Sequence, residues 1–178
     1  MEKRPTIEER MKRIRLLVLD VDGVLTDGGI YMGPEGEALK RFDIKDGLGI
    51  MLWHRAGGLT AILTGRSSKI VENRARELHI SVVRQGCAEK RAAYEELKAE
   101  LIISDEEVAY IGDDIIDLPV MKRVGLPVAV ADAVPEVRDA ASLVVKHKGG
   151  RGAVRETVER ILRAQGCFEE AAALYLSS

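Results

Sequence analysis

The sequence predicts an α/β protein whose Rossmann-like parallel sheet carries helices on both faces. Short apolar runs rich in branched side chains, which are typical of buried strands, alternate along the chain with longer stretches typical of helices. Parallel strands joined by right-handed crossovers produce this alternation. Polar residues gather where three of the apolar runs end, and in such sheets ligands bind at the carboxyl ends of the strands. We therefore expect a functional site at that edge of the sheet.

The first half of the chain follows this pattern from residue 14 onward. The apolar run at 14–19 is stopped by acidic residues and Gly23, which indicates a buried strand that ends in a turn. Residues 26–42 predict a small β-hairpin, because two short strand-like stretches flank a Gly/Pro turn. The other elements expected here are a helix capped by Asp46 and ending near Gly57, a strand at 59–63, a helix from Ser67 to about Leu78 and a strand at 80–83.

The second half continues the alternation without a repeat or a linker. The elements expected here are a charged helix at 88–101, a strand at 108–111, a short helix through Met121, strands at 127–130 and 143–145, and a closing helix at 152–164. We therefore expect residues 1–178 to form a single domain that ends in a tail at 166–178.

Charge and composition exclude several classes of partner. The 27 Lys and Arg residues nearly balance the 29 Asp and Glu residues, and the net charge of -2 predicts no binding to nucleic acid or to an anionic membrane. The apolar run at 14–19 is too short for a signal peptide or a membrane span. Cys87 and Cys167 lie far apart in the sequence, which favours a reducing cytoplasm. His54, His79 and His147 have no metal-ligand spacing, and we expect no role for them.

The segment Asp20-Val-Asp-Gly23 follows the first strand directly. Asp20 and Asp22 stand at alternate positions, so both carboxylates can face the same side of the sheet edge. Carboxylates this close repel each other unless a cation or a shared proton lies between them, which points to a hard ion such as Mg²⁺. Asp113, which follows the strand at 108–111, would supply a third carboxylate. Taken alone, the Asp-x-Asp-Gly segment fits a turn with a helix cap equally well.

Two further motifs follow the next strands. Thr64, Gly65 and Arg66 come after the strand at 59–63, where a hydroxyl and the N–H groups of a helix N-terminus can bind an anion. A simple helix cap explains that segment as well. Lys90 lies early in the helix after the third strand, and by itself it could be one of several solvated lysines.

Taken together, the motifs resemble those of the haloacid dehalogenase superfamily. Asp-x-Asp-Gly, Thr-Gly, a Lys and Gly-Asp-Asp-x-x-Asp occur in this order, each near a strand exit. The resemblance implies the fold of that superfamily, with Asp20 as the nucleophile that takes a phosphoryl group. It implies that Asp22 is the acid/base, which protonates the leaving oxygen and later activates water. It also implies a Mg²⁺ ion bound by Asp20, the main-chain carbonyl of Asp22 and Asp113.

The same resemblance implies supporting roles for four other residues. Thr64 and Lys90 would hold the phosphoryl oxygens as charge shifts in the transition state. Asp114 and Asp117 would order the metal site and Lys90 rather than bind the metal themselves. Many members of the superfamily carry an inserted cap domain, but the stretches 23–64 and 66–113 are too short to hold one. A site without a cap either accepts large substrates or takes its lid from another subunit.

Within the superfamily, the chain resembles the phosphatases of 3-deoxy-D-manno-octulosonate 8-phosphate from about residue 14 to the C-terminus. The segments that carry this resemblance are 45–50, 64–66, 112–121, 128–133 and 149–156. It implies a cytoplasmic homotetramer that releases an eight-carbon sugar acid for the lipopolysaccharide inner core. It also implies that the hairpins at 26–42 assemble into a central barrel and that the tail at 166–178 reaches over a neighbour's site.

A sugar acid carries a carboxylate, so selectivity requires a cation away from the phosphate. Arg66 is the best candidate, because a guanidinium binds a carboxylate through two hydrogen bonds. Lys45 and Asp46 are expected to contact the sugar. Arg151 either acts across a subunit boundary or caps the closing helix. Arg74 is expected to be a solvated helix residue.

Three rival interpretations remain at the level of sequence. A phosphatase of nine-carbon, sialic-acid-type 9-phosphates would share the catalytic motifs, but the Arg66 position is typically not Arg in that family. A non-catalytic tetramerising module would not need Asp20, Asp22, Lys90 and Asp113 together. A two-component receiver domain carries its phosphorylated aspartate after a later strand, which disagrees with the motif order here.

Overall fold

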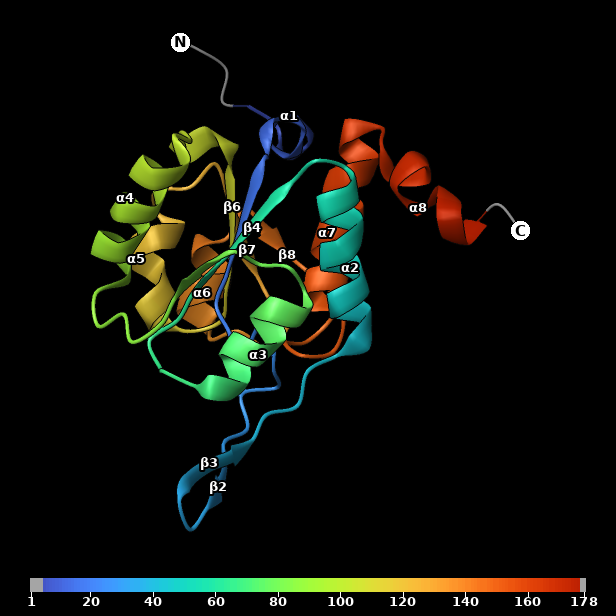
Figure 1. The fold of residues 1–178 in the computed structure, drawn as a ribbon. Helices are drawn as coiled ribbons and strands as arrows, with labels where there is room; N and C mark the ends of the chain where they lie inside the picture. The colour runs from blue at the N-terminus through green and yellow to red at the C-terminus, as the bar shows by residue number, and fades with distance from the viewer. Residues whose placement is uncertain (1–4, 177–178) are drawn as a thin grey trace.

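The structure is a computed structural model that describes residues 5–176 of the chain. Its centre is a six-stranded parallel sheet with the strand order β5-β4-β1-β6-β7-β8 (Figure 1). The strands are β1 (Leu16–Leu19), β4 (Leu59–Leu63), β5 (Val82–Arg84), β6 (Val108–Gly112), β7 (Leu126–Ala129) and β8 (Leu143–Val144). The predicted α/β fold with a parallel sheet is confirmed.

Strand β1 lies between β4 and β6, and all four of its residues are buried. Leu19, its last residue, pairs with Ile62 of β4 and with Ile111 of β6. The three strands therefore end at nearly the same level. Because parallel strands share a direction, the residues that follow them meet at one edge of the sheet. This register brings three separate sequence motifs together.

Helices cover both faces of the sheet, as predicted. In Figure 1, α4 and α5 lie on one side of the sheet and α2 and α7 lie on the other, where α1 packs on α7. The helices are α1 (Ile7–Arg13), α2 (Ile44–Arg55), α3 (Lys69–Glu77), α4 (Lys90–Leu101), α5 (Leu118–Met121), α6 (Pro135–Ala140), α7 (Ala153–Gln165) and α8 (Phe168–Leu176). Short 3-10 turns, η1 (Asp105–Glu107) and η2 (Ile115–Asp117), precede β6 and α5.

The predicted hairpin consists of β2 (Tyr31–Gly33) and β3 (Gly36–Leu39), and it extends away from the body of the molecule (Figure 1). Within residues 5–176, the hairpin and α2 are the only elements between β1 and β4. The segment from β4 to β6 holds only α3, β5, α4 and η1. The expectation that these two segments hold no cap domain is confirmed.

Several element boundaries differ from the expectation. Asp43, not Asp46, caps α2, because the Asp43 carboxylate accepts the N–H of Lys45 at 2.7 Å. Ser68, not Ser67, caps α3. The charged leader forms α1, and α6 was not expected. The segment expected as a tail forms α8, which packs against α2 and α7. No helix in the described part of the chain is both long and apolar enough to cross a membrane.

Candidate active site

Asp20 and Asp22 follow β1 at the carboxyl edge of the sheet, in a turn that requires a glycine. Gly23 has φ +89°, which side chains rarely adopt. A Cβ atom added to Gly23 would lie 2.0 Å from Oδ2 of Asp113. The turn after β1 and the acidic loop after β6 are therefore in direct contact. The close approach needs the absence of a side chain at residue 23.

Three carboxylates meet at this edge and are suited to a cation. One oxygen from each of Asp20, Asp113 and Asp117 lies within 4.8 Å of the others. Among the described residues, Oδ1 of Asp113 is buried and accepts no hydrogen bond. Burial and the charges of Asp117 and Asp20 raise the pKa of Asp113 to about 8. A hard divalent ion would satisfy the free oxygen and remove this repulsion.

Lys90, the first residue of α4, is buried beside the nucleophile candidate. Its Nζ lies 2.8 Å from Oδ2 of Asp20 and donates to Oδ1 of Asp117 at 2.7 Å. Burial lowers the pKa of Lys90, but the charges of Asp20 and Asp117 outweigh that effect and raise it. The group is therefore a cation at neutral pH, held within reach of any phosphoryl group on Asp20. This burial excludes the alternative that Lys90 is one of several solvated lysines.

Asp117 has both of its oxygens occupied by donors. Oδ1 accepts from Lys90 and, at 2.6 Å, from the hydroxyl of Tyr110, while Oδ2 accepts the N–H groups of Asp113 and Asp114 at 2.9 and 3.2 Å. These contacts suit the expected ordering of Lys90 and of the loop better than metal binding. Asp114 is exposed, and its carboxylate accepts the N–H of Ile115 at 2.7 Å, so it caps η2.

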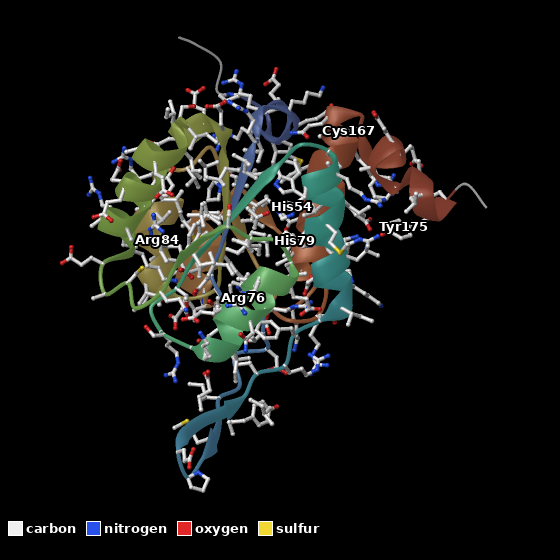
Figure 2. The ribbon with its side chains drawn as sticks, viewed as in Figure 1. His54, Arg76, His79, Arg84, Cys167 and Tyr175 are labelled. Atoms are coloured by element: carbon white, nitrogen blue, oxygen red, sulfur yellow. The ribbon has the colours of Figure 1, made fainter. Side chains whose placement is uncertain are left out.

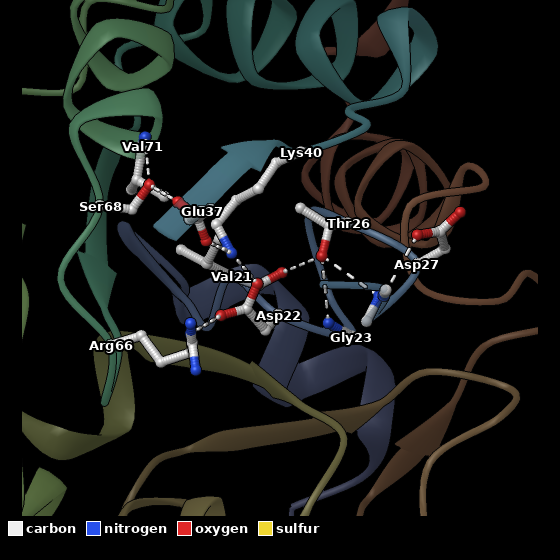
Figure 3. Close-up of polar contacts among 12 residues, drawn as sticks. Val21, Asp22, Gly23, Thr26, Asp27, Glu37, Lys40, Arg66, Ser68 and Val71 are labelled. Atoms are coloured by element: carbon white, nitrogen blue, oxygen red, sulfur yellow. Dashed lines mark hydrogen bonds and ion pairs between the residues drawn. The ribbon is translucent and has the colours of Figure 1, made fainter. Parts of the chain in front are cut away.

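Asp22 contacts cations that reach it from two directions (Figure 3). Its Oδ1 is paired with Nζ of Lys40, and its Oδ2 lies 3.7 Å from Nε of Arg66. Lys40 also lies 2.8 Å from Oε1 of Glu37. Sequence reasoning missed both Lys40 and Glu37. Their Glu-x-x-Lys spacing in a short hairpin is a weak signal, because solvated surface pairs can have the same spacing.

The segment after β4 borders the same edge. Thr64 is buried and its backbone is fixed, because its N–H donates to Arg84 at 2.9 Å and its carbonyl accepts from Cys87 at 3.1 Å. Gly65 and Arg66 are exposed. A groove of about 500 Å³ opens beside them, lined by Gly65, Cys87, Ala88, Glu89, Lys90, Arg91, Ile116 and Pro119. It could admit a substrate larger than phosphate alone.

The glycine-rich segment before α7 supports the turn after β1. Gly150 donates its N–H to the carbonyl of Val24 at 2.8 Å, and a Cβ at Gly149 would lie 1.7 Å from the carbonyl oxygen of Gly23. Arg151, the next residue, is exposed and lies 3.6 Å from Oδ2 of Asp27. The N-cap of α7 is Gly152, not Arg151. The alternative of a helix cap at Arg151 is therefore wrong.

Two of the expected side-chain positions need correction. Asp46 was expected to contact the sugar, but it is buried, and its carboxylate accepts the N–H groups of Gly152 and Arg155 at 3.1 and 2.8 Å. It therefore joins α2 to the start of α7. Arg74 was expected to be solvated, but it pairs with Glu77 at 2.9 Å and its guanidinium lies 5.6 Å from the ring of Phe42. Lys45 is exposed, as its expected sugar contact requires.

His54, His79 and Cys167 lie apart from this cluster, whereas Cys87 lines the groove beside Lys90. His54, on α2, shares a hydrogen bond with the hydroxyl of Thr60 at 2.9 Å. Figure 2 shows His54 near His79, and both line a cavity at the start of β4 and β5. Burial, with a smaller contribution from His79, lowers the pKa of His54. Cys167 lies at the turn into α8 (Figure 2). Both cysteines are free thiols.

Comparison with known proteins identifies related chains over nearly the full length. The sequence model of the haloacid dehalogenase-like hydrolase family matches residues 67–156, about half of the 178 residues. The 3-deoxy-D-manno-octulosonate 8-phosphate phosphatase of Yersinia pestis is 52% identical over 166 residues, which cover 93% of this chain and 89% of that protein. Its crystal structure aligns with a TM-score of 0.90 over 92% of this chain and 88% of that chain.

A second crystal structure was determined with ligands bound. It shows 3-deoxy-D-manno-octulosonate 8-phosphate phosphatase from Moraxella catarrhalis in complex with a magnesium ion, a phosphate ion and a KDO molecule. This protein is 40% identical to the chain and aligns with a TM-score of 0.92 over 95% of this chain and 97% of that chain. The two folds therefore agree over most of the length of both chains.

Proposed function

Because the chain belongs to the 3-deoxy-D-manno-octulosonate 8-phosphate phosphatases of the haloacid dehalogenase-like hydrolases, we propose that it hydrolyses this sugar phosphate with Mg²⁺. The products are the free eight-carbon sugar acid and phosphate. The contact between Asp20 and Lys90 carries the proposal, because it joins a nucleophile to a cation that can hold a phosphoryl oxygen. In a non-catalytic module the burial of this ion pair would have little purpose, because the cost of desolvating the two charges offsets most of the stability that their attraction provides.

Mg²⁺ fits the acidic cluster. The donors would be Asp20, Asp113 and the main-chain carbonyl of Asp22, since carboxylate and carbonyl oxygens are the ligands that this ion prefers. The buried, unpaired Oδ1 of Asp113 is the observation that supports the fit. When bound, the ion supplies positive charge that screens the carboxylate nucleophile from the incoming phosphate.

The reaction proceeds in two transfers through a phospho-aspartate. A carboxylate oxygen of Asp20 attacks phosphorus, the bond from phosphorus to the sugar oxygen breaks, and Asp22 gives that oxygen its proton. Water then attacks the phosphorus of the phospho-aspartate, the bond from phosphorus to the Asp20 oxygen breaks, Asp22 takes up a proton from the water, and phosphate leaves. Lys90 and the hydroxyl of Thr64 hold the phosphoryl oxygens while charge builds up on them.

We assign selectivity for the sugar acid to exposed cations, of which Arg66 lies beside Asp22. The guanidinium of Arg66 lies 3.7 Å from Oδ2 of Asp22, where it can reach a carboxylate on the departing sugar. Lys45 and Arg151 are secondary candidates, because both are exposed and Arg151 already contacts Asp27 at the site. Gly65 leaves room for the substrate beside Arg66. The presence of Arg66 favours the eight-carbon substrate over nine-carbon relatives.

A phosphate-release assay tests the proposal. Purified protein is given a panel of sugar phosphates that includes the eight-carbon 8-phosphate and a nine-carbon 9-phosphate, each with Mg²⁺ and with chelator. We expect the highest kcat/KM for the eight-carbon substrate and no turnover in chelator. Preference for the nine-carbon substrate would support the rival phosphatase. Folded protein that releases phosphate from none of them would support the non-catalytic module.

We further propose that the chain works as a cytoplasmic homotetramer in lipopolysaccharide inner-core synthesis. The hairpin supports the assembly, because it exposes apolar side chains on a two-stranded sheet, a unit that is marginally stable by itself. The exposed residues are Ile30, Tyr31, Met32 and Leu39. Packing hairpins from several subunits together would bury these side chains. The capless site also favours assembly, since a neighbour can provide a lid.

We propose that the C-terminal segment at 166–178 reaches over the active site of a neighbouring subunit and not over its own. In the chain's own fold, α8 packs near the end of α2, where the ring of Tyr175 lies 5.2 Å from the Arg55 guanidinium. That end of α2 leads into the start of β4 and is therefore remote from the carboxyl edge of the sheet. Residues 177 and 178 lie outside the described residues.

A further inference from the structure

Lys40 is an unusual residue for a small hairpin, because its side chain is fully buried. It follows β3 directly, and the side chain has 0% exposure. Nζ pairs with Oδ1 of Asp22 and lies 2.8 Å from Oε1 of Glu37 (Figure 3). Burying a lysine removes its hydration, and the free energy lost in this way can equal or exceed what the buried ion pair contributes. A stability role alone therefore gives little reason to bury an ammonium group here.

Glu37 is in turn attached to the body of the protein. Its Oε2 accepts a hydrogen bond from the hydroxyl of Ser68, the residue that caps α3. The N–H of Ser68 donates to Oε1 of Gln85 at 2.8 Å. The chain of contacts therefore runs from the loop after β4, through the hairpin, to Asp22. It fixes the position of Lys40 from two sides.

We propose that Lys40 is a positioning residue for Asp22 and that Glu37 and Ser68 anchor it. This inference rests on the proposed function, in which Asp22 is the acid/base. The ammonium group occupies Oδ1 and so selects one orientation of the carboxylate. Oδ2, on the side of Arg66, is then the oxygen that gives the proton to the departing sugar and later takes one from water. Misplacing this oxygen by about 1 Å can slow a proton transfer by about a hundredfold.

The experiment compares two leaving groups in the first turnover, with enzyme in excess over substrate. The sugar oxygen needs a proton when it departs, whereas the oxygen of p-nitrophenyl phosphate leaves readily without one. In Lys40→Met we expect the single-turnover rate on the sugar phosphate to fall by about tenfold to a hundredfold. The rate on p-nitrophenyl phosphate should fall by about threefold or less, and the KM for the sugar phosphate should change by about twofold or less. A general disturbance of the site would slow both substrates alike.

Lys69→Met is the matched control. Lys69 begins α3, its side chain is 74% exposed, and its only described ion pair is with Glu72, so its loss should change neither rate. Glu37→Gln removes one anchor but keeps the length of the side chain. It should produce the same selective loss to a smaller extent. If Lys40→Met does not fold by circular dichroism, the Glu37→Gln rates decide the matter.

The outcomes separate this inference from the proposed function. A wild-type protein that prefers another sugar phosphate contradicts the proposed substrate, and the variants are then measured on the preferred one. Equal losses on both leaving groups, or unchanged rates in the folded variants, overturn the role of Lys40. A folded wild-type protein that hydrolyses no phosphate ester overturns both.

Discussion

The carboxylate of Asp20 is fixed at both oxygens, which defines a test of its role. Oδ2 faces Lys90 at 2.8 Å, and Oδ1 accepts the N–H of Val21 at 2.7 Å. Asp20→Asn keeps the shape of the side chain but removes the nucleophilic charge. We expect phosphate release to fall by about a thousandfold or more with no loss of fold. Activity and circular dichroism should be compared with Asp139→Asn, which changes an exposed carboxylate on α6. Appreciable residual turnover would exclude Asp20 as the nucleophile.

Asp113 should make the metal-free protein sensitive to pH. Its pKa is raised to about 8 from the usual 3.8 of an aspartate, so the folded state binds more protons than the unfolded state between these two pH values. Stability without metal therefore decreases as pH rises through this range. We expect the Tm in chelator to fall from pH 5 to pH 8 and Mg²⁺ to restore it most at pH 8.

Asp113→Asn provides the control for that measurement. It removes one of the repelling carboxylates, so the Tm in chelator should depend less on pH and the gain from Mg²⁺ should shrink. Thermal melts of both proteins, with and without Mg²⁺, measure the effect. A wild-type Tm in chelator that rises steadily to pH 8 would contradict it.

The residues that could be predicted are those whose signal is local. Asp20, Asp22 and Asp113 follow apolar runs directly, so the strand pattern alone brings them to one edge. Lys40 and Asp46 could not be assigned in this way. Lys40 meets Asp22 across 18 positions of sequence, and Asp46 accepts hydrogen bonds from α7 more than 100 positions away. No periodicity or motif encodes such contacts.

At the scale of elements, the sheet was easier to predict than the ends of the chain. The strands are buried apolar runs bounded by turns, and the expected positions agree with the observed ones to within about two residues. Helices α1, α6 and α8 were not predicted, because their sequences carry no clear helical pattern. They are short, and α1 and α6 are rich in charge, so their apolar positions do not repeat clearly. Packing against α7, in the case of α1 and α8, stabilises what the local sequence does not specify.

Helix α8 should contribute to stability as well as to any contact with a neighbour. The side chains of Phe168, Ala171 and Ala172 are buried against the body of the chain. We expect Phe168→Ala to lower the free energy of unfolding by on the order of 2 kcal/mol, because it exposes apolar surface and leaves a gap. Leu174→Ala, in the same helix but 72% exposed, is the control and should have little effect. Equal denaturation midpoints for the two variants would show that α8 does not pack as described.

At the scale of the whole molecule, the hairpin connects assembly to the active site. Its strands expose apolar side chains, while Lys40 at its base contacts Asp22. Met32, 66% exposed on β2, is the most exposed of these apolar residues. Met32→Lys would introduce a charge into the proposed barrel of hairpins, and burying that charge is costly. We therefore expect the tetramer to dissociate.

Light scattering after size-exclusion chromatography measures the mass of the assembly directly. The wild type should have four times the 19.5 kDa mass of the chain, and Met32→Lys should give a smaller species. Ile102→Lys introduces the same charge at a 90% exposed isoleucine after α4 and should remain tetrameric. A variant at Met32 that keeps the wild-type mass would contradict assembly through the hairpin. If the smaller species also loses turnover of the sugar phosphate, assembly through the hairpin is required for activity.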